Sequence, residues 1–330
     1  MSRKVSGGSG SGVDVLLTGA DGFIGRQLTQ RFEAMDLSVI GTDIRGEGNG
    51  CVRMDITSTS QVRSVIRTFR PKRVVHLAAI VDDRGAPDLF HTVNVGGTQN
   101  VLEAAMDVAL ERFVHVSSIV ALGFDPGRDA DERSPLVTDT GSPYFDTKAR
   151  SELIVRRVGT EKGVPTVIIR PGDVYGPGSE PWVLRPITLM RKRLPVLVDG
   201  GRGLIAHCWI DNLVDALVLA TTEPKAEGHT FQIHDGSDGT TYRQYFRLLA
   251  RAAQVPQPRL SLPHRPALML GRAFDRIAKH TSFVPPFSEA AVRFISRRAT
   301  YCMRSSRDIL GFKPVVDLPE GMERLASALR

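Results

Sequence analysis

The stretch VDVLLTGADGFIGRQLTQRF, Val13–Phe32, predicts a strand, a glycine-rich turn and a helix in direct succession. Its apolar start, Val13–Leu17, is typical of a parallel strand that is buried on both faces. In the turn, Gly19 permits a tight bend, Gly22 lets the backbone approach a pyrophosphate, and Gly25 lets helix and strand pack closely. Because a helix N-terminus attracts anions, we predict that this turn holds the pyrophosphate of a dinucleotide.

A second strand supports this interpretation. The run LSVIGTDIRG ends its apolar part at Asp43, 18 residues after Gly25. A carboxylate at that distance can accept hydrogen bonds from the adenosine ribose and would repel a 2′-phosphate. NAD is therefore favoured over NADP, although the nearby Arg45 could accommodate a phosphate. A simple turn residue is the alternative role for Asp43.

The alternation of strands and helices continues along the chain and predicts an α/β fold with a doubly wound parallel sheet. In such a sheet, ligands collect at the C-terminal ends of the strands. The expected strands lie within 51–56, 73–81, 112–123 and 164–178, with a helix over 94–106.

The bulk composition is that of a globular chain. Its 330 residues are 42% hydrophobic and 24% charged, and no apolar run reaches the roughly 18–20 residues that span a bilayer. Residues 1–12 are expected to form a flexible lead rather than a signal peptide. Three scattered cysteines without a CxxC pair predict neither a disulfide framework nor a metal site, and we expect a cytoplasmic protein.

Positive charge is concentrated in the last quarter of the chain. Residues 251–330 carry 14 Lys and Arg against 6 Asp and Glu. Such an excess favours an anionic substrate, peripheral contact with an anionic membrane, nucleic acid, or simply a solvated basic face. Nucleic acid is the weakest of these, because the arginines are dispersed and no nucleic-acid-binding motif accompanies them. We expect no nucleic-acid partner.

The segment SPYFDTK contains the residues best suited to chemistry. Tyr144 and Lys148 are four apart, so one helix face carries both, and Ser117 and Ser118 end an earlier strand. A phenol has a pKa near 10, but a neighbouring ammonium and a cationic nicotinamide favour its ionised form. With a serine hydroxyl on the substrate oxygen, the group suits proton exchange coupled to hydride transfer. A solvated lysine and a serine cap are the bland alternatives.

Together these motifs resemble the extended short-chain dehydrogenases/reductases from about Val13 to the C-terminus. TGADGFIG, Asp43, HLAA, NVGGTQN, VSSIVALG, YFDTK and IIRPGDVYGPG follow the family's order. The resemblance implies a Rossmann-type fold, a homodimer and a catalytic trio of Ser118, Tyr144 and Lys148; Ser118 is preferred over Ser117 because the active hydroxyl lies five residues before Gly123. The cofactor contacts that we assign are Gly19, Gly22, Phe23, Ile24, Gly25, Asp43, Asp55, Ile56, Leu77, Ala78, Ala79, Asn94, Tyr144, Lys148, Pro171 and Val174.

Three positions and the C-terminal segment narrow the choice among the reactions of this superfamily. Ile119 and Val120 stand where similar dehydratases carry Asp-Glu, so elimination of water is disfavoured. Ile205 takes the place of an arginine that nucleotide-sugar enzymes use on the diphosphate, although Arg202 is close. The C-terminal segment is similar to that of the 3β-hydroxysteroid dehydrogenase branch. That resemblance implies an NAD(P)-dependent interconversion of secondary alcohol and ketone on a bulky apolar, possibly anionic, substrate of sterol or long-chain β-hydroxy acid type.

Two other functions stay open: a sugar-nucleotide epimerase with tightly bound NAD, and a non-catalytic NAD(H)-sensing protein. The domain organisation expected is an NAD-binding domain of 13–172 and 203–232, and a smaller discontinuous substrate domain of 173–202 and 233–330. In the latter, apolar residues recur at helical spacing over 265–280. This helix could line an apolar pocket, rest on a membrane surface, or be an ordinary lid helix.

Overall fold

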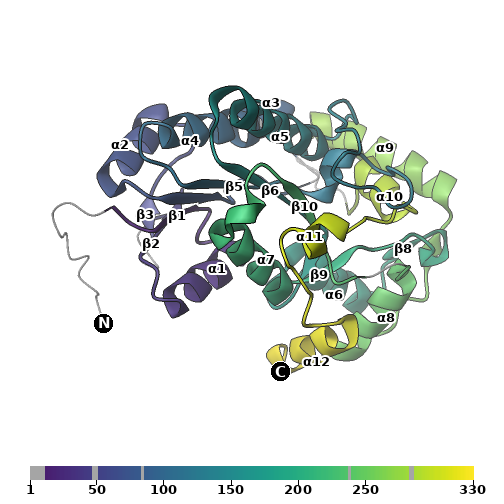
Figure 1. Ribbon diagram of the computed structural model, residues 1–330. Helices are drawn as coiled ribbons and strands as arrows, with labels where there is room; N and C mark the ends of the chain where they lie inside the picture. The colour runs from purple at the N-terminus through teal and green to yellow at the C-terminus, as the bar shows by residue number, and fades with distance from the viewer. Residues whose placement is uncertain (1–11, 47–50, 83–84, 237–238, 282–285) are drawn as a thin grey trace.

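The computed structural model describes residues 12–46, 51–82, 85–236, 239–281 and 286–330. The lead expected over residues 1–12 therefore lies, except for Gly12, outside the described residues. Seven parallel strands form one sheet in the order β10-β6-β5-β4-β1-β2-β3 (Figure 1). They are β1 (Val15–Thr18), β2 (Val39–Asp43), β3 (Val52–Arg53), β4 (Arg73–His76), β5 (Arg112–Val116), β6 (Thr166–Pro171) and β10 (Thr230–Ile233). The doubly wound sheet predicted from the sequence is confirmed, with the strand order reversing between β1 and β4.

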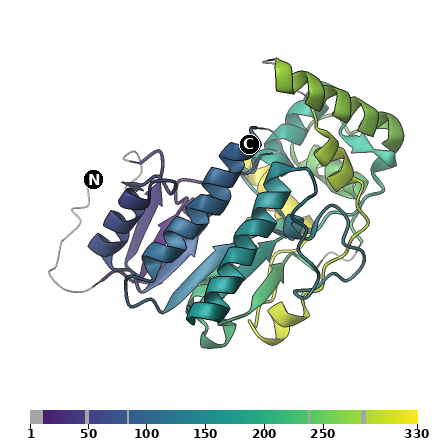
Figure 2. The ribbon, with the colours of Figure 1, turned by 90° about the horizontal axis from the view of Figure 1, so that it is seen from above.

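Helices cover both faces of this sheet because successive strand residues point to opposite sides. Val15 and Leu17 of β1 join the core beneath α1 and α7, whereas Leu16 joins the core beneath α2, α4 and α5. Figure 2 shows α2, α4 and α5 side by side across one face. The covering helices are α1 (Phe23–Ala34), α2 (Thr59–Phe69), α4 (Gly97–Ala105), α5 (Pro143–Lys162) and α7 (Ile210–Thr222).

The local sequence explains where the longest of these helices begins and ends. α5 starts with Pro143 in its first turn, a position that needs no N–H donor, and ends before Gly163, whose φ of 65° is left-handed. α4 begins three residues later than the helix expected over 94–106, because a π-helical turn, η1 (His91–Gly96), precedes it.

Most of the remaining elements gather at one end of the sheet, whereas α3 lies beside α5 (Figure 1). Two small parallel sheets pair β7 with β9 and β8 with β11. The elements are α3 (Pro87–Phe90), β7 (Asp173–Tyr175), α6 (Arg185–Arg191), β8 (Leu197–Val198), β9 (His207–Trp209), α8 (Tyr242–Ala252), β11 (Ser261–Leu262), α9 (His264–His280), α10 (Glu289–Ile295), α11 (Arg304–Asp308) and α12 (Leu318–Ala328). The chain returns to the main sheet through α7 and β10. The discontinuous division into two domains stays a prediction.

Candidate active site

Strand β5 and helix α5 bring the predicted trio together. Ser118 follows β5 by two residues and starts a 3₁₀ turn, η2 (Ile119–Leu122), by accepting a hydrogen bond from the Val120 amide at 3.3 Å. Tyr144 and Lys148 lie one turn apart at the start of α5. Ser118 lies near enough to the Tyr144 phenol to lower the pKa of the phenol. The fold thus brings the end of β5 and the start of α5 together at the trio, where Lys148 Nζ donates to the Val116 carbonyl.

The two ionisable groups of the trio are shifted in opposite directions by burial. Burial, with a smaller contribution from the charge of Asp173, raises the pKa of Tyr144 to about 12 against the lowering effect of Ser118. Burial lowers the pKa of Lys148 to about 8, against the raising effect of Glu152. The Lys148 ammonium donates to the Val116 carbonyl at 2.8 Å. In this structure the phenol is therefore protonated at neutral pH, and Lys148 is mostly charged.

A buried ion pair that the sequence analysis did not single out supports the trio. The carboxylate of Glu152, one turn after Lys148, accepts from Arg170 Nη2 at 2.7 Å and from the Ser117 hydroxyl at 2.7 Å. The Glu152 and Arg170 side chains are both fully buried. Spacing of four residues from Lys148 was the available sequence signal for Glu152. The pair joins α5, β6 and the end of β5, and it gives Ser117 a structural partner that leaves Ser118 to face Tyr144.

Two neutral histidines lie close to Lys148. His76 and His115 stack with ring centroids 5.8 Å apart. Burial, with a further contribution from the Lys148 charge, lowers the pKa of His76 to about 3 and that of His115 well below its usual value. Thr18 and Thr98 hydrogen-bond the two nitrogens of His76 at 2.8 and 3.0 Å. Neutral imidazoles avoid placing a second cation beside Lys148.

The glycine turn between β1 and α1 fits a dinucleotide. Gly19 has a φ of 70°, a backbone conformation that side chains disfavour, and a Cβ on Gly25 would lie 2.2 Å from the Gly19 carbonyl oxygen. No side chain caps α1 at Gly22. The first-turn amides of α1, including those of Phe23 and Ile24, are thus in the place where a helix binds phosphate.

Asp43 ends β2 beside this turn. Its carboxylate accepts hydrogen bonds from the Asp21 amide at 3.3 Å and from the Arg45 amide at 3.1 Å. The carboxylate is therefore fixed at the C-terminal edge of the sheet next to the glycine turn, as a ribose ligand requires. The Arg45 side chain is exposed.

The other predicted cofactor contacts divide into two groups. Leu77, Ala78 and Ala79 directly follow β4, Pro171 ends β6 and Val174 lies in β7, so they border the same edge of the sheet. Three others make internal contacts: Asp55 Oδ1 accepts from the Thr57 amide and hydroxyl, Ile56 packs against Gly97, and Asn94 bonds Ile80 and Thr147. The Asn94 contacts anchor α5 one residue before Lys148. Cofactor binding by these positions stays a prediction.

An aromatic cluster packs beside Tyr144. The Phe145 ring lies 6.2 Å from that of Tyr144, 4.6 Å from that of Phe124 and 5.3 Å from that of Phe294. Trp182 packs against Phe294 at 6.3 Å. The sequence analysis did not find this cluster, because its members come from segments far apart in the chain.

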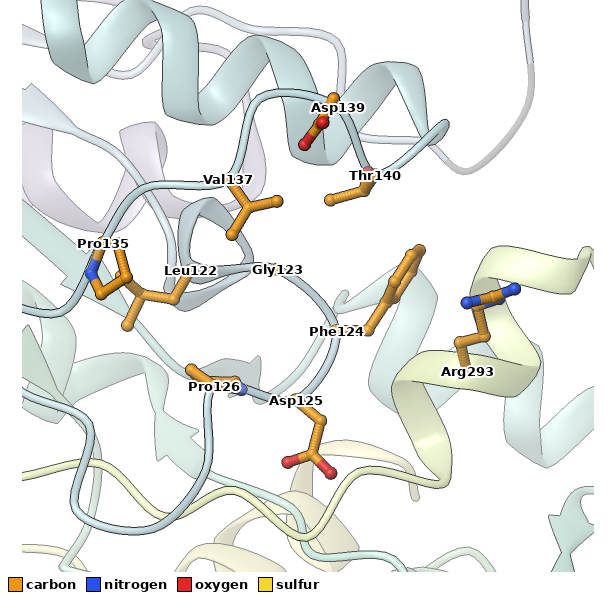
Figure 3. Close-up of a pocket in the computed structure, with 10 residues that line it drawn as sticks. All are labelled: Leu122, Gly123, Phe124, Asp125, Pro126, Pro135, Val137, Asp139, Thr140 and Arg293. Atoms are coloured by element: carbon orange, nitrogen blue, oxygen red, sulfur yellow. The ribbon is translucent and has the colours of Figure 1, made fainter.

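Next to this cluster lies a cavity of about 410 Å³. Figure 3 shows Phe124 between the loop after η2 and Arg293, which reaches in from α10. The trio is not part of its lining, which consists of Leu122, Gly123, Phe124, Asp125, Pro126, Pro135, Val137, Asp139, Thr140 and Arg293. The cavity adjoins the catalytic region through Phe124 and Phe145.

In nucleotide-sugar enzymes that resemble this chain, an arginine at the position of Ile205 binds the diphosphate, and Arg202 is the nearby arginine here. Ile205 is 1% exposed and belongs to the core. Arg202 is exposed and donates to the carbonyl and carboxylate of Asp199.

A second buried ion pair, Asp173–Arg297, lies next to the aromatic cluster. Asp173 of β7 accepts from Arg297, which follows α10, and from the Ala206 amide at 3.0 Å. Burial raises the pKa of Asp173, whereas Arg297 lowers it. The guanidinium also contacts the Tyr242 hydroxyl and lies 3.7 Å from the centre of the Phe294 ring. Arg297 thus joins β7, α8 and the aromatic cluster.

Among the described residues, no group of three or more His, Cys, Asp or Glu is placed to hold a metal ion. The helices in the same part of the chain include none that is long and apolar enough to cross a membrane.

Comparison with known proteins gives the family context. The model of the NAD dependent epimerase/dehydratase family matches residues 15–233. A 3beta-hydroxysteroid-dehydrogenase/decarboxylase of Arabidopsis thaliana is 26% identical over 88% of this chain and 69% of its own. A UDP-glucose 4-epimerase of Vibrio cholerae is 27% identical over 95% and 94%. The UDP-glucose 4-epimerase of Thermus thermophilus, in complex with NAD, has the same fold, with a TM-score of 0.74 and 24% identity over 96% of this chain and 99% of that chain.

Proposed function

Because the chain belongs to the NAD dependent epimerase/dehydratase family, we propose that it is an NAD-dependent dehydrogenase or reductase that interconverts a secondary alcohol and a ketone on a bulky apolar substrate. The substrate class proposed is a hydroxysteroid, a sterol or a long-chain β-hydroxy acid. The observation that carries the proposal is the position of Tyr144 and the buried Lys148 one turn apart on α5, beside Ser118 and at the edge of an aromatic cluster.

The cofactor fits the turn at Gly19, Gly22 and Gly25, with Asp43 as the ribose ligand. NAD held there would supply the hydride acceptor for alcohol oxidation, and NADH the hydride donor for ketone reduction. Asp43 supports NAD over NADP, because its carboxylate is fixed where a 2′-phosphate would be repelled. The exposed Arg45 is the residue that would have to turn inward to reverse this preference.

Tyr144 exchanges the proton in this mechanism. In ketone reduction, the protonated phenol gives its proton to the substrate oxygen; in alcohol oxidation, the phenolate takes that proton back. Ser118 Oγ donates a hydrogen bond to the same substrate oxygen. Lys148 stabilises the phenolate by its charge and holds the ribose. The high pKa of Tyr144 in this structure describes the form that starts the reductive direction.

Three observations support an apolar substrate. Phe145 contacts the Tyr144 ring and packs against Phe124 and Phe294, and the cavity beside Phe124 offers room for a bulky skeleton. Ile205 is buried where an arginine would bind a diphosphate. The similarity to a plant 3beta-hydroxysteroid-dehydrogenase/decarboxylase points in the same direction.

A sugar-nucleotide epimerase is the second candidate. It is favoured by 27% identity to the Vibrio cholerae UDP-glucose 4-epimerase over nearly the whole of both chains. An epimerase returns the hydride to the same substrate, so it would interconvert UDP-sugars without net formation of NADH.

The experiment is a panel assay with a variant of Tyr144. Hydroxysteroids and β-hydroxy acids are offered with NAD or NADP, and the absorbance of the reduced cofactor is followed, beside a test of UDP-glucose and UDP-galactose interconversion. With a verified substrate, Tyr144→Phe should lower kcat by roughly 10²–10⁴-fold.

The matched control is Tyr175→Phe, which removes a buried hydroxyl that has no hydrogen-bond partner among the described residues. Full turnover by Tyr144→Phe would refute the mechanism. UDP-sugar epimerisation without NADH formation, with no turnover of the other panel members, would establish the second candidate instead.

A further inference from the structure

Helix α9 has one face packed on the protein and one face turned outward. On the packed face, a Cβ at Gly271 would lie 2.8 Å from the Glu289 amide nitrogen, so α9 and the start of α10 approach closely. Ala267 is fully buried, and the Phe274 ring packs against that of Phe287 with centroids 5.3 Å apart. These contacts fix which side of α9 faces away.

The outward face is apolar. The Met269 side chain is 70% exposed and that of Ile277 is 47% exposed. Large apolar side chains exposed together on one helix face form the kind of patch that marks an interaction surface. At 3.6 residues per turn, the exposed apolar positions fall within a stripe about 100° wide along the helix. They are Pro266, Met269, Leu270, Ala273 and Ile277.

A row of arginines borders the stripe on one side. Arg265, Arg272 and Arg276 are exposed and follow one another along the helix axis. Arg272 also pairs with Glu289 at 3.0 Å. Asp275 faces the packed side, where its carboxylate accepts from the Glu289 amide at 2.9 Å. Over 264–278 the outward face therefore presents apolar side chains and positive charge, with no acidic side chain.

The position of α9 makes this face accessible. Both views place α9 at the outer margin of the molecule, away from the main sheet (Figures 1 and 2). The strand before it, β11, follows Arg259 and Leu260, of which Leu260 is 57% exposed. The same combination of charge and apolar surface thus continues just ahead of the helix.

We propose that the outward face of α9 lies on an anionic lipid surface, with the helix axis in the plane of the membrane. An apolar stripe of this width enters the boundary between headgroups and acyl chains, while the arginines remain level with the phosphates. This inference is independent of the reaction proposed above. A second copy of the chain docked through the same face is a less suitable partner. The arginine row of each copy would then find no acidic side chain on the outward face of the other.

The test is co-sedimentation of the full chain with phospholipid vesicles. One set is pure phosphatidylcholine, and the other contains about one-third phosphatidylglycerol. Binding should be clear on the anionic vesicles at low salt, weaker on neutral ones, and reduced at high salt, where the Debye length shrinks to a few ångströms. No binding to anionic vesicles at low salt would overturn the proposal.

Two double variants separate the apolar and ionic contributions. Arg265→Gln/Arg276→Gln leaves the Arg272–Glu289 pair intact and should lower partitioning onto anionic vesicles roughly ten- to thirtyfold. Met269→Gln/Ile277→Gln should lower it roughly tenfold or more on both vesicle types. These positions are exposed, so folding should be unaffected, which circular dichroism and thermal unfolding check.

Matched controls lie elsewhere on the surface. Arg63→Gln/Arg157→Gln removes two exposed arginines from α2 and α5, and Val315→Gln/Leu329→Gln removes apolar side chains that are 68% and 39% exposed. Both controls should bind as the parent does. Equal losses in variants and controls would overturn the proposal. So would unchanged vesicle binding accompanied by a change in oligomeric mass, which would make the face a contact between copies.

Discussion

Lys148 has a charge that is sensitive to mildly alkaline pH. Its ammonium is buried and donates to the Val116 carbonyl, and burial holds its pKa at about 8. Glu152 opposes that shift from one turn away, through its negative charge. The trio is therefore tuned by a group outside it, and this dependence can be measured.

We expect the proposed ketone reduction to fall as pH rises through about 8, because Lys148 would then lose the charge that we propose stabilises the phenolate left after proton donation. Glu152→Gln removes the charge that raises the pKa of Lys148, so this alkaline limb should move to lower pH. The measurement is kcat/KM against pH for parent and variant. Glu161→Gln, an exposed position on the same helix, is the control; an unmoved limb in Glu152→Gln would disprove the coupling.

Loss of activity above pH 8 should not reflect unfolding. The pKa of Lys148 in the fold is below its ordinary value of 10.5, so the unfolded chain binds this proton more tightly. Between about pH 8 and 10.5 the unfolded state holds more protons, and the contribution of Lys148 to the free energy of unfolding rises with pH. Activity and this contribution to stability therefore change in opposite directions.

At the scale of elements, periodicity and turn chemistry predicted much of the fold. The glycine turn after Val15–Thr18 and the spacing of Tyr144 from Lys148 are local patterns, so they can be read from the sequence. The π-helical turn at His91–Gly96 could not be read from the sequence in this way, because Asn94 in this turn bonds Ile80 and Thr147 from other segments. Pairing of Glu152 with Arg170 was likewise hidden, since it forms only after α5 packs on the sheet.

The close packing of α1 against the glycine turn predicts that a single added methyl group at Gly25 destabilises the protein. Gly25→Ala should lower the free energy of unfolding by about 1–3 kcal/mol, because the added Cβ would meet the Gly19 carbonyl oxygen at 2.2 Å and Ala20 Cα at 2.7 Å. Displacement of the turn should also weaken NAD binding by roughly tenfold or more.

Titration calorimetry with NAD and urea unfolding measure both effects. Gly96→Ala is the matched control, since a Cβ there has its nearest neighbour at 3.9 Å, and it should leave stability unchanged or slightly higher. Equal stability and NAD affinity of Gly25→Ala and the parent would show that the turn does not pack against the helix in this way.

At the scale of the whole molecule, the Asp173–Arg297 pair links β7, where Asp173 is the first residue, to the C-terminal region after α10. Its members are 124 residues apart, so no sequence spacing points to them. Arg297 also contacts Tyr242, and its backbone carbonyl accepts from the Leu204 amide at 2.8 Å. One side chain thus ties together segments that the chain reaches at very different points.

Removing one partner of this pair should cost more than removing both. Arg297→Met leaves the Asp173 carboxylate buried without its cation, and the free energy of unfolding should fall by about 3–5 kcal/mol. Asp173→Asn/Arg297→Met removes the stranded charge and should recover about 1–3 kcal/mol of that loss, a coupling that urea unfolding of the full double-mutant cycle measures. Arg298→Met, at the adjacent exposed position, should change stability by less than about 0.5 kcal/mol. Strict additivity of the two single changes would mean that the charges do not stabilise each other, and that Arg297 holds the C-terminal region through its ring and backbone contacts alone.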